Sequence, residues 1–69
     1  MIQLHHKSSR IEITEYEPST GALTIFFKRG GTYEYKDVDA FDYDAMVMNP
    51  SIGKGFNENI KHKYTGVKV

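Results

Sequence analysis

The chain has 69 residues, no cysteine, and nine basic and nine acidic side chains, so its formal net charge is zero. This length allows one small domain, and without cysteine its stability must come from hydrophobic packing rather than from disulfides or a Cys-based zinc site. An apolar content of 39% excludes a disordered composition. No stretch is apolar enough to cross a membrane, and the N-terminal residues lack the apolar core of a secretory signal. We therefore expect a single cytoplasmic domain over residues 1–69, with its core in residues 8–64.

The first predicted strand begins at Ile11. Strict alternation places Ile11 and Ile13 on one face and Tyr16 on the other, so we expect a bulge or a change of register near Thr14. Residues 18–21, Pro-Ser-Thr-Gly, predict a turn after this strand.

Two further strands follow. Residues 22–28 alternate clearly, with Leu23, Ile25 and Phe27 on one face. A glycine pair at residues 30–31 indicates a hairpin, and residues 32–36 form the third strand, with Tyr33 and Tyr35 on one face. The three strands predict an antiparallel meander that needs a cover on one side.

The second half of the chain predicts two helices. Asp39 is a suitable N-cap for the first, which Asn49-Pro50 ends because the residue before proline avoids helical dihedrals. Its apolar residues recur at roughly helical spacing and are Phe41, Ala45, Met46 and Met48.

Ser51 is positioned to cap the second helix. Phe56, Ile60 and Tyr64 lie four residues apart and form a stripe on one face of it. Residues 65–69 are predicted to be a short tail. The predicted fold is α+β, a three-stranded antiparallel meander followed by two helices on one face, in the order β-β-β-α-α.

The order of these motifs resembles that of the KTSC domain. This family takes its name from its occurrence at the C-terminus of some lysyl-tRNA synthetases, and it also occurs as a stand-alone protein in bacteria and phages. The matching positions are Ser8, Ser9 and Ile11, Leu23, Ile25 and Phe27, Gly30, Tyr33 and Tyr35, Val38, Tyr43, and Ser51, Gly53, Phe56, Asn57, Ile60 and Tyr64. The resemblance implies a small domain of uncharacterised function, with RNA binding suggested by the synthetase fusion.

The distribution of charge leads to a first hypothesis, in which the basic C-terminal third binds RNA or tRNA. Residues 1–49 carry five basic and eight acidic side chains, whereas residues 50–69 carry four lysines and one glutamate. The predicted contacts are Lys54, Asn57, Lys61 and Lys63. Arg10, Lys28 and Arg29 extend this set to a broader patch if the fold brings them together. Such binding would be weak and salt-dependent.

Two details of this hypothesis have structural alternatives. Tyr33 and Tyr35 would stack unpaired bases if exposed, but their shared face favours packing under the helices. Ser51 and Gly53, with Lys54, fit an anion site at the start of the second helix. The alternative is that Ser51 caps the helix and Gly53 makes a turn.

A second hypothesis is a protein-interaction domain that binds a host protein through the acidic segment 37–44. The candidate contacts are Asp39, Phe41, Asp42, Tyr43 and Asp44. The alternative is that these acids stabilise a helix N-terminus. Self-association, for example through Phe26, stays open.

Catalysis and cofactors are not expected. The sequence contains no nucleophile motif and no evident acid–base pair. His5 and His6 are adjacent on an extended segment and point in opposite directions, and His62 lies far along the chain, so a metal site is not predicted.

Overall fold

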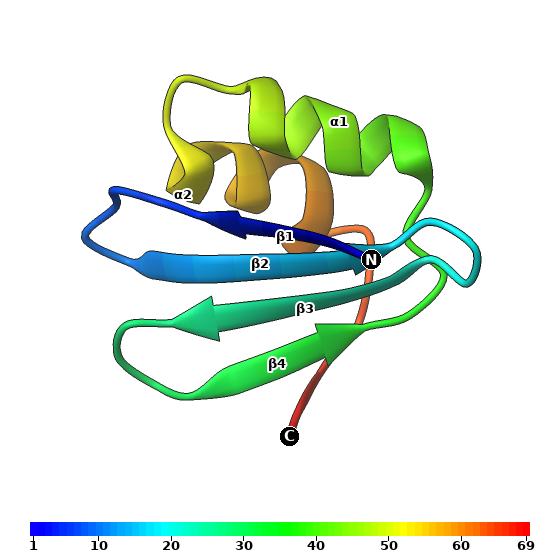
Figure 1. Ribbon diagram of the computed structural model, residues 1–69, viewed down its shortest axis with the longest axis horizontal. Coiled ribbons are helices and arrows are strands. Elements are labelled where there is room, and N and C mark those ends of the chain that lie inside the picture. The colour runs from blue at the N-terminus through cyan, green and yellow to red at the C-terminus, as the bar shows by residue number, and fades with distance from the viewer.

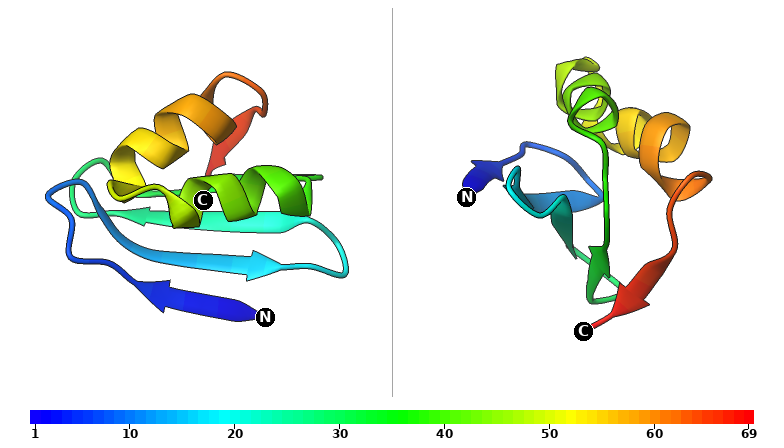
Figure 2. Two further views of the ribbon diagram at one scale, coloured as in Figure 1. Left: turned by 90° about the horizontal axis from the view of Figure 1, so that it is seen from above. Right: turned by 90° about the vertical axis from the view of Figure 1, so that its right-hand side faces the viewer.

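The computed structural model describes residues 1–69 as a five-stranded antiparallel sheet with both helices on one face (Figures 1 and 2). The strands lie in the sheet in chain order. The elements are β1 (Ile2–His5), β2 (Ile11–Glu17), β3 (Ala22–Phe27), β4 (Thr32–Tyr35), α1 (Ala40–Met48), α2 (Ile52–Phe56), the π-helical turn η1 (Asn57–Lys61) and β5 (Gly66–Lys68). The predicted α+β class and the helix placement are confirmed. No helix is long and apolar enough to span a membrane.

The prediction of three strands is wrong, because both ends of the chain join the sheet as edge strands. β1 pairs with β2, with Leu4 opposite Thr14, and β5 pairs with β4, with Gly66 opposite Tyr35. A side chain at Gly66 would lie 2.6 Å from the Tyr35 ring, so glycine lets the last strand approach. Strands this short and exposed lack the alternation by which a strand is recognised in sequence.

The bulge in β2 lies earlier than predicted. The register shifts between Ile11 and Ile13, not near Thr14. As a result Ile11, Thr14 and Tyr16 are buried under the helices. Ile13 faces the opposite side of the sheet, where it pairs with Phe26. One extra residue in a strand thus exchanges which side chains reach the core.

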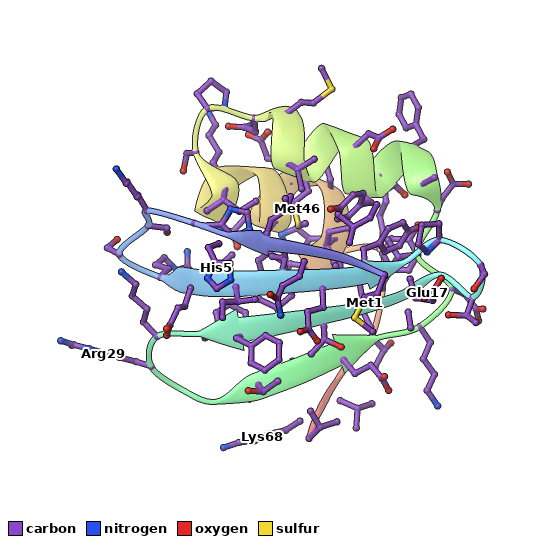
Figure 3. All side chains as sticks on the ribbon, in the orientation of Figure 1. Met1, His5, Glu17, Arg29, Met46 and Lys68 are labelled. Carbon is purple, nitrogen blue, oxygen red and sulfur yellow. The ribbon has the colours of Figure 1, made fainter.

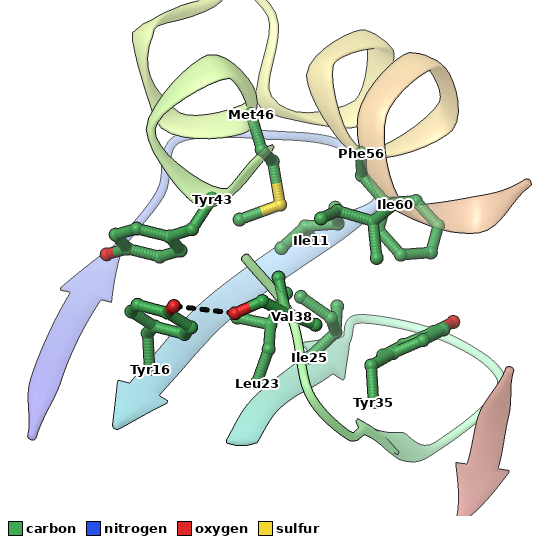
Figure 4. Close-up of a cluster of buried hydrophobic side chains, with 10 residues drawn as sticks. All are labelled: Ile11, Tyr16, Leu23, Ile25, Tyr35, Val38, Tyr43, Met46, Phe56 and Ile60. Carbon is green, nitrogen blue, oxygen red and sulfur yellow. Dashed lines mark hydrogen bonds between the residues drawn. The ribbon is translucent and has the colours of Figure 1, made fainter. Parts of the chain in front are cut away.

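The core lies between the sheet and the helices (Figure 4). The buried hydrophobic residues are Ile11, Tyr16, Leu23, Ile25, Tyr35, Val38, Tyr43, Met46, Phe56 and Ile60. The Tyr16 ring stacks on Tyr43 with centroids 4.1 Å apart, and its hydroxyl donates to the Val38 carbonyl at 2.7 Å. Each buried aliphatic or aromatic side chain contributes about 1.5–3 kcal/mol relative to exposure.

Helix α1 has its predicted ends but not its predicted apolar face. The Asp39 carboxylate accepts from the Phe41 backbone N–H at 2.8 Å, which confirms the N-cap, and the helix ends at Met48. However, Phe41 and Met48 are 77% and 81% exposed. Of the predicted residues, Met46 is fully buried and Ala45 is half-buried. The buried face carries Asp42 and Tyr43 beside Met46, because Tyr43 stacks on the sheet through Tyr16.

Helix α2 begins with the predicted Ser51 cap and buries Phe56, while Ile60 is buried from η1. Gly55 lies where α1 crosses α2. A Cβ there would collide with the Met46 carbonyl oxygen, so this crossing needs glycine. The loop 49–51 between the two helices is thereby held close to the sheet end that carries the first hairpin loop.

Candidate nucleic-acid interface

In an antiparallel meander, successive connections between strands lie alternately at the two ends of the sheet. The β1–β2 loop, residues 6–10, and the β3–β4 loop, residues 28–31, share one end. The β2–β3 turn, residues 18–21, and the β4–α1 linker, residues 36–39, share the other. Figure 3 shows Arg29 at the first end and Glu17 at the second.

Contacts bring together several of the segments that carry the basic side chains of the first end. The Lys28 backbone N–H donates to the Arg10 carbonyl at 2.8 Å. The Arg10 side chain lies over α2, with its Cδ 3.8 Å from where a Cβ on Gly53 would be. The Lys68 side chain reaches Gly31 from β5, with its Cε 2.9 Å from a Cβ built there. We call Lys7, Arg10, Lys28, Arg29 and Lys68 the basic end.

The basic end is free of neutralising partners. The three ion pairs of the structure involve the N-terminus, Lys54 and Lys63, and none of them involves a member of the basic end. The loops 6–10, 28–31 and 49–51 contain no Asp or Glu. Clustered cations without local counter-charges create a positive potential that attracts anionic partners.

The lysines predicted from the C-terminal third do not gather in this way. Lys63 bonds Asp42 at 3.0 Å, and Lys54 lies 3.9 Å from Glu58 one helical turn away. Lys61 is exposed and forms no ion pair, but it lies at the end of η1, two residues before Lys63. Asn57 has a buried Oδ1 with no hydrogen-bond partner, and nothing in the structure explains this.

The two tyrosines proposed to stack on bases differ in burial: Tyr35 belongs to the core, and Tyr33 packs against it. Tyr35 is 7% exposed, and its ring meets Phe56 edge to face at 5.6 Å. Tyr33 is half-buried and meets Phe27 in the same manner at 5.8 Å. The alternative, packing under the helices, is confirmed for Tyr35, whereas Tyr33 is only partly buried at the edge of the core.

Ser51 and Gly53 have structural roles as well. The Ser51 hydroxyl oxygen accepts from the Lys54 backbone N–H at 3.3 Å, which is the capping alternative. Gly53 lies within α2 rather than in the predicted turn, and it is buried beneath Arg10. The two residues of the predicted anion site therefore lie beside Arg10 of the basic end. They do not form an anion-binding loop.

The acidic segment is largely engaged with the protein itself. Asp42 is 7% exposed and accepts from the Tyr64 hydroxyl at 2.6 Å and from the Lys63 ammonium. These hydrogen bonds, Tyr64 first, hold the pKa of Asp42 below its usual value. Asp39 caps α1, and Tyr43 is buried with its hydroxyl unpaired. Phe41 and Asp44 are the members of the predicted protein-binding set that remain exposed and unbonded.

Lys7 and Lys68 were not predicted from the sequence. Arg10, Lys28 and Arg29 were named only as an extension of the patch, without a position in the fold. A usable signal was present: successive connections of a meander alternate between its two ends. The first and third connections are basic, whereas the second and fourth carry no basic residue except Lys36. The basic end becomes visible when the charges of the loops at each end of the meander are added together, and not when charge is counted along the chain.

Comparisons with known proteins agree with the fold. The family model described as KTSC domain matches residues 7–64. A protein from Tsukamurella paurometabola is 30% identical over 63 residues, which cover 91% of this chain and 94% of that protein. A crystal structure of a KTSC domain protein from Yersinia pestis is 31% identical, with a TM-score of 0.89 over 99% of this chain and 96% of that one.

Proposed function

This chain belongs to the KTSC domain family, and we propose that it is a non-enzymatic domain whose basic end binds the phosphate backbone of RNA. The observation that carries the proposal is the placement of five cations without ion pairs at one end of the fold, where they come from three separate parts of the chain. An overall neutral protein gains nothing in stability from such clustering, because like charges repel. An anionic partner that neutralises these cations would explain why they lie at one end.

The proposed binding is electrostatic and weakly selective for sequence. The Tyr35 ring is buried and the Tyr33 ring is half-buried against Phe27, so the proposal assigns no base stacking to either. With about five phosphates neutralised on a single strand, log K should fall with log salt at a slope of about −3.5. Affinity would then drop about 100-fold between about 50 and 200 mM salt.

A titration of fluorescent single-stranded RNA and tRNA at these two salt concentrations tests the proposal. We expect the double variant Lys28→Glu, Arg29→Glu to lose affinity at least tenfold at the lower salt. The matched control is Lys36→Glu, Lys61→Glu, which reverses two exposed charges away from the basic end and should bind almost as the wild type does. Equal losses in both variants, or no binding by the wild type at about 50 mM salt, would contradict the proposal.

One observation favours a second candidate, a protein partner on helix α1. Phe41 and Met48 are highly exposed on this helix, with Asp44 between them in sequence. A photo-reactive residue at Phe41 should then cross-link one host protein reproducibly, and Asp44→Lys should abolish the cross-link. Its persistence, or the absence of any cross-link, would count against this candidate.

A further inference from the structure

A polar cleft lies beside the basic end, between two loops that are far apart in sequence. Residues 6–9 form one wall and residues 49–52 form the other, together with Val47 at the end of α1. Its volume is about 480 Å³, within the range of about 300–1,000 Å³ typical of small-ligand sites. The cleft therefore has room for one terminal nucleotide of a strand, or for a small anionic molecule.

The polar side chains of the cleft present donors rather than acceptors. The Ser8 hydroxyl oxygen accepts from the Arg10 and Ile11 backbone N–H groups at 3.1 and 3.3 Å. The Asn49 side-chain oxygen accepts from the Ser51 N–H at 3.0 Å. With these oxygens committed to the backbone, Ser8 has its O–H and Asn49 has its NH₂ free to donate.

Ser51 follows the same rule, because its oxygen caps the Lys54 N–H and its own proton remains available. Ser9 makes no hydrogen bond to the protein through its side chain and adds a further hydroxyl. In Ser8, Asn49 and Ser51 the oxygen thus accepts from the protein backbone, and the O–H or NH₂ group is left to donate to a ligand.

Charge in the cleft points the same way. Lys7 is the one permanently charged residue of the lining, and no carboxylate lines the cleft. His6 is held by a hydrogen bond between its Nε2 and the Thr14 hydroxyl at 2.9 Å. A donor-rich, acceptor-poor cleft with one ammonium group complements a ligand that has several anionic acceptors and no donors of its own.

We propose that this cleft binds a terminal phosphate, a phosphomonoester group held by Lys7, Ser8, Ser9, Asn49 and Ser51. A phosphomonoester presents three anionic oxygens, one more than a phosphate within a strand, and thus uses more of these donors. Val47 and Ile52 supply an apolar wall against which the attached sugar would lie. The proposal deepens the function proposed above, on which the assignment of the phosphate to an RNA end rests.

The test compares oligoribonucleotides of one sequence that carry a phosphate at the 5′ end, a phosphate at the 3′ end, or hydroxyls at both ends. We expect one of the phosphorylated strands to bind about tenfold more tightly than the hydroxyl strand. Ser9→Asp should bring this ratio to one by placing a carboxylate in the cleft. Arg29→Glu, outside the cleft, should weaken all strands by the same factor.

A second measurement keeps the two proposals separable. Titration of the ¹⁵N-labelled protein with uridine 5′-monophosphate, and with inorganic phosphate, should shift the amide signals of residues 6–9 and 49–52. A ratio of one in the wild type, with salt-dependent binding of every strand, would overturn the cleft proposal and leave the proposed function standing. Shifted amides without RNA binding would overturn the proposed function and assign the cleft to a free phosphorylated molecule. The absence of both responses would overturn both.

Discussion

The two ends of this molecule differ in what their charges do. The basic end carries five cations that form no ion pair: Lys7, Arg10, Lys28, Arg29 and Lys68. The opposite end, which we call the acidic end, carries five carboxylates: Glu17, Asp37, Asp39, Asp42 and Asp44. Three of them bond to the protein itself. Asp39 caps α1, Asp42 bonds Tyr64 and Lys63, and Glu17 bonds Ser19.

This difference separates charge that stabilises the fold from charge available to a partner. A helix cap or a satisfied, mostly buried carboxylate has a structural role whether or not a ligand exists. Exposed cations held together by the topology have no such role. A net charge of zero conceals the contrast, since the two ends cancel in the sum.

The largest effect on stability is expected at Asp42, the carboxylate that accepts hydrogen bonds from two side chains. Asp42→Ala removes the acceptor of both the Tyr64 hydroxyl and Lys63 and should lower the free energy of unfolding by about 2 kcal/mol. The matched control is Asp44→Ala, which removes a neighbouring exposed carboxylate without hydrogen bonds and should stay within about 0.5 kcal/mol. Urea unfolding of both variants measures this. Equal effects would show that the Asp42 network does not stabilise the fold.

A smaller effect is expected from pH. Because the folded pKa of Asp42 lies below the unfolded value, its contribution to stability is complete above about pH 4 and is lost as the pH falls through the lower, folded pKa. The free energy of unfolding of the wild type should therefore decline more steeply below about pH 4 than that of Asp42→Asn. Parallel profiles from thermal unfolding at several pH values would contradict this assignment.

The sequence was sufficient for those parts of the fold that local patterns determine. The central strands, the turn at residues 18–21 and the caps Asp39 and Ser51 follow from alternation and side-chain chemistry over a few residues. The edge strands β1 and β5 depend on pairing with distant partners, which local patterns do not encode. The bulge position was missed for a related reason, because β3 determines which residue of β2 is extra.

The candidate site was harder to predict than the fold. Lys54, Lys61 and Lys63 are near one another in sequence. Lys63 nevertheless bonds Asp42 on α1, a contact between residues 21 positions apart. Conversely, Arg10 and Lys28 are far apart in sequence and meet through a backbone hydrogen bond. Proximity in sequence was therefore a poor guide to a charged surface. The alternation of connections in the meander would have been a better one.

The smallest effect is expected on the exposed face of α1, which neither end uses. Phe41→Ser with Met48→Ser should change the free energy of unfolding by no more than about 0.5 kcal/mol, since both side chains are already in water in the folded state. Met46→Ala, on the buried face of the same helix, should lower the free energy of unfolding by about 2–5 kcal/mol. This variant is the positive control for the unfolding measurement. The double serine variant should also bind RNA as the wild type does, because Phe41 and Met48 lie outside the basic end. If the double serine variant lost RNA affinity while its stability was unchanged, the RNA interface would include α1. RNA binding would then no longer be confined to the basic end.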